Sequence, residues 1–130
     1  MGEDPYSLLI VDDDEATLES MTTYFTKRGF AVTAASNGLD ALKVLESRTD
    51  FDAVITDIVM PDVSGIGVIS VAKRRLSGVP LIAITGWGEH PEGLASEAEA
   101  DRVIKKPIEL AALEKIILKL LKTKRMDSSP

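Results

Sequence analysis

Short apolar runs alternate along the chain with longer segments in which apolar residues recur every three or four positions. The short runs hold almost no polar residues, which is typical of strands covered on both faces. They predict five strands, at residues 7–11, 30–35, 52–56, 79–85 and, more weakly, 102–104. The alternation of strands and helices predicts an α/β fold, a doubly wound parallel sheet with right-handed crossovers and helices on both faces.

The helices are identified by their apolar spacing and by the signals at their ends. Asp14 is placed to cap the first helix, and Gly29 is placed to end it. The predicted helices cover residues 15–27, 39–46, 65–76 and 108–122, with a shorter one at about 93–100. Glycines and a proline crowd residues 86–93, which confines that shorter helix to the residues after them.

Length and composition limit the class of protein. A chain of 130 residues suits one domain, which we expect to span residues 1–125, followed by a tail or linker start at 126–130. Its 45% hydrophobic and 28% charged residues indicate a globular rather than a disordered protein. The lack of cysteine excludes disulfides and thiolate metal sites, and the single histidine, His90, argues against a His-rich zinc site.

Charge and hydropathy limit the partners and the location. The net charge is −6 and no basic stripe is present, so we expect no direct binding of nucleic acid. No apolar stretch approaches the roughly 18 residues of a membrane span, and the N-terminus lacks the features of a signal peptide. We therefore expect a cytoplasmic protein that does not contact a membrane.

Polar residues collect where the predicted strands end. In an open parallel sheet the ligand site lies beyond the carboxyl ends of the strands, where the strand order reverses. We therefore expect one site to be formed by the residues at these ends. They are Asp12, Asp13, Asp57, Thr85 and either Lys105 or Lys106.

These residue types favour a metal-assisted reaction of a phosphoryl group. Carboxylates about 4 Å apart repel by about 4 kcal/mol at an effective dielectric constant near 20, so three of them require a cation. Oxygen ligands without His or Cys nearby favour Mg²⁺. An Asp carboxylate can attack phosphorus, and a lysine and a hydroxyl can hold the transferred group. Thr85 and Lys106 supply these groups, and Lys106 is preferred over Lys105 because it adjoins Pro107.

Four segments, taken in order, resemble the receiver domain of bacterial two-component response regulators. They are Leu9-Ile10-Val11-Asp12-Asp13-Asp14, Thr56-Asp57-Ile58-Val59-Met60-Pro61 with Gly65 four residues on, Ile84-Thr85-Gly86, and Lys106-Pro107. The resemblance extends from Leu8 to about Lys122. It implies the flavodoxin-like topology, with strand order 2-1-3-4-5.

The resemblance implies a phosphoacceptor and a set of metal ligands. Asp57 is expected to accept a phosphoryl group from a phosphohistidine, carried by a sensor histidine kinase or a histidine phosphotransfer protein. Asp13 is expected to bind Mg²⁺ directly and Asp12 partly through water, with Asp57 and the backbone carbonyl of Val59 as the other ligands.

The resemblance also implies how the phosphoryl group is held and how its arrival changes the domain. Lys106, whose bond to Pro107 the family often holds cis, is expected to pair with the phosphoryl oxygens, and Thr85 is expected to bind the new phosphate. The domain would then change its affinity for a downstream effector protein or a missing output domain. We expect a monomer or a weak dimer that depends on phosphorylation.

Three features depart from the family pattern. Val103 stands where the family commonly has Tyr or Phe, the ring that couples phosphorylation to the outer surface. Val59 and Trp87 occupy positions that tune the phosphoryl lifetime, and because both are apolar we expect slow autodephosphorylation. The glycine-rich residues 86–93 and the short helix after them are expected to be mobile and to respond to phosphorylation.

Two further interpretations remain open on the residues alone. A phosphatase of the haloacid dehalogenase type would also use Mg²⁺ and an Asp nucleophile with an acid two residues later, a spacing that Asp12 and Asp14 satisfy. The chain is short for the additional elements of that family. A degenerate receiver that accepts no phosphate is disfavoured by the intact site residues. We therefore expect a switch rather than an enzyme, with at most slow autophosphatase activity.

Overall fold

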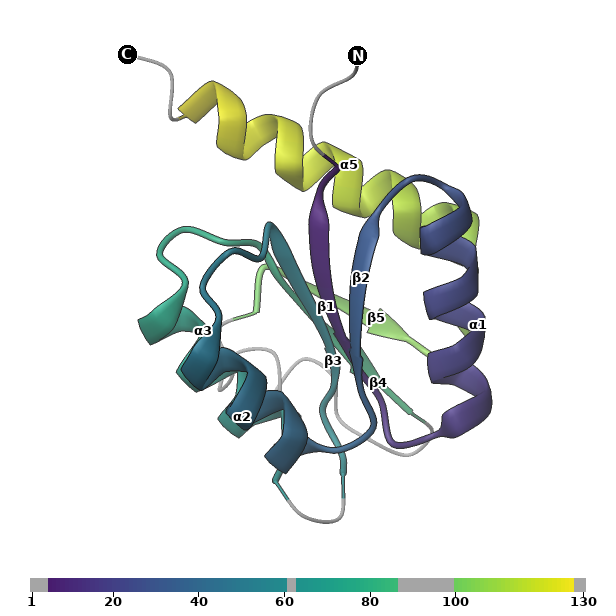
Figure 1. Cartoon of the computed structure of the whole chain (residues 1–130). Coiled ribbons are helices and arrows are strands. Elements are labelled where there is room, and N and C mark those ends of the chain that lie inside the picture. The colour runs from purple at the N-terminus through teal and green to yellow at the C-terminus, as the bar shows by residue number, and fades with distance from the viewer. Residues whose placement is uncertain (1–4, 61–62, 87–99, 128–130) are drawn as a thin grey trace.

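Five parallel strands form a single sheet in the order β2-β1-β3-β4-β5 (Figure 1). The computed structural model describes residues 5–60, 63–86 and 100–127. The strands are β1 Ser7–Val11, β2 Ala31–Ala35, β3 Ala53–Asp57, β4 Leu81–Thr85 and β5 Arg102–Lys105. The sheet confirms the predicted doubly wound α/β fold and the strand order that the resemblance implies.

Helices cover both faces of the sheet, α1 and α5 on one face and α2 and α3 on the other (Figure 1). They are α1 Glu15–Lys27, α2 Gly38–Ser47, α3 Gly65–Arg75 and α5 Leu110–Asp127. None of the helices in the described ranges is long and apolar enough to cross a membrane. The helix expected at 93–100 lies, except for Ala100, outside the described residues, as do Trp87 and His90.

Most predicted boundaries agree with the observed ones to within two residues, and two of the differences have a clear physical reason. Asp57 is the last residue of β3 rather than the first residue after it, because it pairs in register with Ile84 of β4. The helix α5 begins at Leu110 instead of Ile108, after the turn at Lys106 and Pro107. It also continues to Asp127, five residues beyond its predicted end and into the segment expected to be a tail.

The core forms two layers, because successive side chains of a strand point to opposite faces of the sheet. The strands β1, β3 and β4 are buried almost throughout, whereas the edge strands β2 and β5 keep exposed positions. One layer includes Leu9, Val54, Leu45, Val68 and Ile69. The other includes Ile10, Ile55, Met21, Phe25, Leu113 and Ile117. The central strands are therefore the most completely buried part of the sheet.

Side-chain caps fix the helix starts just beyond the strand ends. The Asp14 side chain accepts a hydrogen bond from Thr17 N at 3.1 Å, which confirms the predicted cap of α1. Asn37 caps α2 and Ser64 caps α3 in the same way. The turn after α1 requires Gly29, whose φ of 94° lies in the left-handed region. The caps at Asp14 and Ser64 mark the ends of the two loops that follow Asp12 and Asp57.

We predict that Leu45 and Leu39, which lie on the same helix, differ sharply in their contribution to stability. Leu45 is fully buried, whereas Leu39 is 49% exposed. Leu45→Ala should lower the free energy of unfolding by about 2–5 kcal/mol, because it removes buried methyl groups and leaves a cavity. Leu39→Ala should change it by less than about 0.5 kcal/mol. Urea denaturation measures both, and equal losses would contradict the assignment of the core.

Candidate functional site

Three carboxylates converge at the carboxyl ends of two neighbouring strands. Asp12 directly follows β1 and Asp57 ends β3, and these strands pair in parallel with Val11 opposite Thr56. Oxygen atoms of Asp12, Asp13 and Asp57 all lie within 4.8 Å of one another. Asp12 is fully buried and Asp57 is 5% exposed, whereas Asp13 is open to solvent. The strand order therefore brings together the three acids that the sequence singled out.

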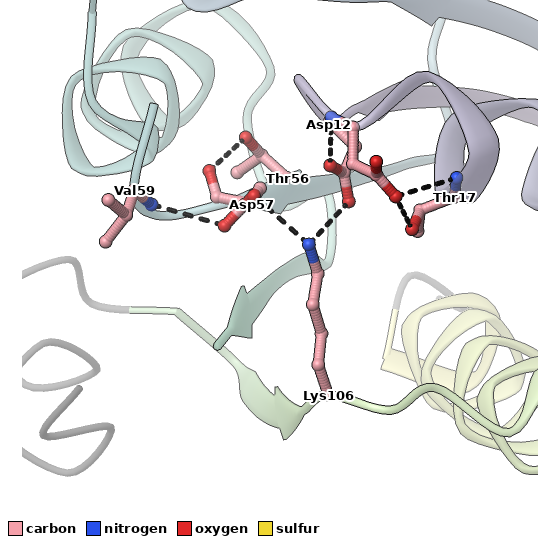
Figure 2. A network of polar contacts seen from close by, with 7 residues as sticks. Asp12, Thr17, Thr56, Asp57, Val59 and Lys106 are labelled. Atoms are coloured by element: carbon pink, nitrogen blue, oxygen red, sulfur yellow. Dashed lines mark hydrogen bonds and ion pairs between the residues drawn. The ribbon is translucent and has the colours of Figure 1, made fainter. Parts of the chain in front are cut away.

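A single lysine lies between the two buried acids. Lys106 Nζ lies 3.3 Å from Asp12 Oδ2 and 3.4 Å from Asp57 Oδ2 (Figure 2). Its backbone N–H donates to the Thr85 carbonyl at 2.8 Å, which continues the pairing of β4 and β5 beyond the strands. The Lys106–Pro107 bond is cis, as the resemblance implied. The turn after β5 thus delivers the ammonium group to the acids.

The two buried acids are each held by a backbone donor two residues further on. Asp14 N donates to Asp12 Oδ1 at 2.9 Å, and Val59 N donates to Asp57 Oδ1 at 3.2 Å (Figure 2). This is the Asx-turn pattern, in which an Asp side chain accepts from the backbone at the end of a strand. The donors are backbone N–H groups, so residue types at positions 14 and 59 give no sign of them; the signal in the sequence is the Asp that ends each apolar run. The turn fixes the orientation of each carboxylate.

Thr85 lies at the same edge of the sheet, at the end of β4. Its side chain is fully buried, and its Oγ1 has no hydrogen-bond partner among the described residues. A buried hydroxyl without a partner costs free energy unless some state of the protein satisfies it.

Val103 lies on the neighbouring strand β5. It pairs with Ala83 and packs against the layer of the core that faces α2 and α3.

The sequence model of the response regulator receiver domain matches residues 8–118. The chain is a receiver domain of the response regulator family. This confirms the resemblance carried by the four segments at the strand ends. Members of this family are signalling switches, which counts against the phosphatase interpretation.

Curated relatives of this receiver domain are longer than the chain. The response regulator SaeR of Staphylococcus epidermidis is 41% identical over 101 residues, which are 77% of this chain and 43% of the relative. SaeR of Staphylococcus aureus (strain USA300) is 36% identical over 101 residues, again 77% of this chain and 43% of the relative. The chain therefore spans less than half the length of the curated relatives that it matches.

Solved receiver domains share the fold over almost their whole length. A CheY-like receiver domain protein from Methanospirillum hungatei JF-1 has a TM-score of 0.87 at 27% identity, covering 95% of this chain and 99% of that one. A response regulator receiver protein from Sinorhizobium medicae WSM419 has a TM-score of 0.83 at 30% identity, covering 93% and 98%. The sheet and its helices are thus those of a receiver domain.

Burial and charge shift the pKa values of the receiver site in a coupled way. Burial raises the pKa of Asp57 to about 6, opposed by Lys106 and reinforced by Asp12. Burial also raises the pKa of Asp12, opposed by its hydrogen bond from Asp14 N and by Lys106. For Lys106, burial alone lowers the pKa, but Asp57 and Asp12 together outweigh it, so the pKa is raised. One ammonium group therefore does not fully compensate the two buried acids.

The donor set fits a hard divalent cation. Its atoms are carboxylate oxygens from three acids. One of them, the buried Asp12 Oδ2, has the ammonium group of Lys106 at 3.3 Å but accepts no well-aligned hydrogen bond from the described residues. Oxygen-only donors with an exposed member suit Mg²⁺, which keeps several waters and binds few carboxylates. Receiver domains typically bind Mg²⁺, and this cluster is the place where such an ion could be held.

We predict that Asp57→Asn stabilises the metal-free domain at neutral pH. Because the folded pKa of Asp57 is about 6 and its ordinary value is 3.8, stability falls as pH rises through this window and levels off above it. Removing the charge should therefore raise the free energy of unfolding by up to about 3 kcal/mol at about pH 8. The gain should disappear below about pH 3, where the carboxyl is mostly protonated in both the folded and the unfolded state.

Urea denaturation in the presence of a chelator, at both pH values, measures this difference. Asp50→Asn is the matched control, because Asp50 is exposed and its pKa is lowered by its hydrogen bonds with Arg48. An Asp57→Asn variant no more stable than the wild type at about pH 8 would contradict the burial cost.

Proposed function

We propose that this receiver domain is a cytoplasmic phosphoacceptor switch in a two-component phosphorelay, with Asp57 as the acceptor. The observation that carries the proposal is the position of Asp57 at the end of a central strand. One of its oxygens lies 3.4 Å from Lys106 Nζ. Oxygen atoms of Asp12 and Asp13 lie within 4.8 Å of Asp57, close enough for the three acids to share one ion. Asp57 is also the member of the cluster whose pKa is raised to about 6.

The proposed reaction moves a phosphoryl group from a histidine to Asp57. The carboxylate oxygen of Asp57 forms a bond to phosphorus while the bond from phosphorus to the histidine nitrogen breaks. The imidazole keeps the electron pair of the broken bond and takes a proton from solvent. Lys106, already placed against Asp57, pairs with the phosphoryl oxygens and offsets part of the charge of roughly −1.5 to −2 that the group carries.

We assign the metal ligands from the same cluster. Asp13, Asp57 and the Val59 carbonyl would hold Mg²⁺ directly, and Asp12 would hold it partly through water. When bound, Mg²⁺ supplies positive charge both to the carboxylates and to the phosphoryl oxygens. The Asp12 carboxylate, fixed by Asp14 N, keeps its second oxygen turned toward Lys106 and the other acids.

Thr85 is the residue that we propose senses the phosphate. Its buried Oγ1 is without a hydrogen-bond partner among the described residues, so a phosphate oxygen within reach would give it an acceptor. In this chain Val103 replaces the aromatic side chain that the family commonly has. The movement of Thr85 would therefore be transmitted without the usual turn of a ring.

The proposed partners are drawn from the family and from the surface next to Lys106. The phosphodonor would be a sensor histidine kinase or a histidine phosphotransfer protein. A hollow of about 520 Å³, lined by residues of α1 and of the segment after β5, adjoins Lys106 and leaves room for a partner side chain. Since the curated relatives are longer, the signal would pass to an effector protein or to a further domain. The receiver domain itself would be a monomer or a weak dimer that forms on phosphorylation.

We predict that acetyl phosphate and Mg²⁺ add one phosphoryl group to the wild-type chain. Intact-mass spectrometry measures the addition, and Asp57→Asn should abolish it because the attacking oxygen is lost. Asp40→Asn, which changes an exposed acid of α2, should leave it unchanged. Labelling of Asp57→Asn to the wild-type extent would contradict the assignment of the acceptor.

We predict a slow loss of the phosphoryl group, which Val59→Asn accelerates. The Val59 side chain is 53% exposed beside Asp57 and presents apolar surface to water that approaches the acyl phosphate. An amide at this position can instead hold a water near the phosphorus. Phosphate release after removal of the donor measures both lifetimes. A wild-type lifetime of only seconds, or one unaffected by Val59→Asn, would contradict the shielding.

A further inference from the structure

The loop between β3 and α3 is closed at its base by a glycine. We call residues 58–64 the acid loop; Pro61 and Asp62 within it are outside the described residues. Gly65 N donates to the Ile58 carbonyl at 2.7 Å. A Cβ on Gly65 would lie 2.6 Å from Ile58 Cα and still closer to the Asp57 carbonyl oxygen. The first turn of α3 thus packs directly on the backbone that comes after the acceptor residue.

A second glycine, on a different helix, meets the other end of the acid loop. Gly38 is the first residue of α2, and a Cβ there would lie 2.6 Å from Val63 Cβ and still closer to the Val63 carbonyl oxygen. Real Cβ atoms essentially never come within 3.0 Å of non-bonded heavy atoms of other residues. The φ of Gly38 is outside the left-handed region, so close approach, and not backbone conformation, is what requires glycine here.

We propose that Gly38 is a positioning residue for the metal and phosphoryl site. The acid loop carries Val59, whose N–H donates to Asp57 and whose carbonyl is the proposed metal ligand. Val63 rests against Gly38 and is joined by Ser64 to Gly65. Gly65 in turn packs on Asp57 and Ile58, so the start of α2 is linked through described residues to the turn that carries Val59. The inference rests on the proposed function, since it concerns a ligand of the proposed Mg²⁺ site.

The contact gives Gly38→Ala a specific expected effect. The added methyl group displaces Val63, which lies two residues before Gly65. Gly65 packs on the backbone of Asp57 and Ile58, so the shift reaches the turn that carries Val59. Alanine favours the helix and the Asn37 cap remains, so α2 itself loses nothing. The concentration of Mg²⁺ at half-saturation should rise about tenfold, the usual scale for loss of support behind a metal ligand.

Two other glycines provide matched controls. A Cβ on Gly67 would meet only Val63 Cγ1, at 3.2 Å, so Gly67→Ala touches the same residue without pressing on its backbone. Gly67→Ala should change the half-saturating Mg²⁺ less than about twofold. Gly29→Ala strains a positive φ far from the site and should lower the melting temperature without changing Mg²⁺ affinity.

The experiment measures metal binding and phosphorylation separately. Binding of Mn²⁺, followed by electron paramagnetic resonance with Mg²⁺ as competitor, gives affinity without any reaction. The initial rate of labelling by acetyl phosphate at increasing Mg²⁺ gives the half-saturating concentration and the limiting rate. We expect Gly38→Ala to raise the half-saturating Mg²⁺ concentration, while its rate of labelling at high Mg²⁺ approaches the limiting rate of the wild type. A merely destabilised variant would instead lose active protein at every Mg²⁺ concentration.

The outcomes separate this inference from the proposed function. A folded Gly38→Ala variant with wild-type Mg²⁺ affinity overturns the inference alone. A wild-type chain that neither binds Mn²⁺ nor is labelled overturns the proposed function and the inference with it. If Gly38→Ala does not fold, Val63→Gly tests the same contact from the loop, because it removes the Cβ that faces Gly38 and frees the backbone of residue 63, its carbonyl included, to move. Unchanged Mg²⁺ affinity in that variant also overturns the inference.

Discussion

Two buried carboxylates at neighbouring strand ends share one ammonium group, and the chemistry of the site follows from this arrangement. The side chains of Asp12 and Asp57 are almost inaccessible to solvent, and Lys106 Nζ lies 3.3 Å from an oxygen of the first and 3.4 Å from an oxygen of the second. Burying two like charges raises their pKa values, and one cation offsets only part of the cost. The apolar strands hold the acids in place despite this cost, so the site is built to receive further positive charge.

The sheet makes this arrangement possible because its strand order reverses beside β1. The strands β1 and β3 are neighbours in space although α1, β2 and α2 separate them in the chain. Their parallel pairing brings both carboxyl ends to one edge. Local geometry then does the fine placement. Asp14 caps α1 with its side chain and holds Asp12 with its N–H, so one turn both starts a helix and orients an acid.

Strand-end residues could be predicted from the sequence, because apolar runs that stop at polar residues mark both the strands and the edge where the site lies. Contacts made by backbone or by distant partners could not. Glu114, for example, is a charged residue of α5 that is nevertheless buried. Its burial is possible because Tyr24 donates to one of its oxygens at 2.8 Å and Arg28 donates to the other at 2.9 Å. A pattern along one helix carries no information about partners some ninety residues away. The close approach of Gly38 to Val63 escaped prediction for the same reason.

The replacement of an aromatic residue by Val103 bears on how the proposed switch would transmit its state. A phosphoryl group on Asp57 adds charge between Lys106 and the acid loop, and only groups that contact it can respond differently in the two states. On one side is Thr85, whose hydroxyl has no partner among the described residues, but no ring is present at position 103 to follow it. On the other side is Val59, whose N–H donates to Asp57. The backbone of Asp57 and Ile58 packs on Gly65, and two residues before Gly65, Val63 meets Gly38 at the start of α2. In this chain the described contacts therefore lead from the acceptor through Gly65 and Val63 to an outer helix, and the proposed role of Gly38 lies at the end of that path.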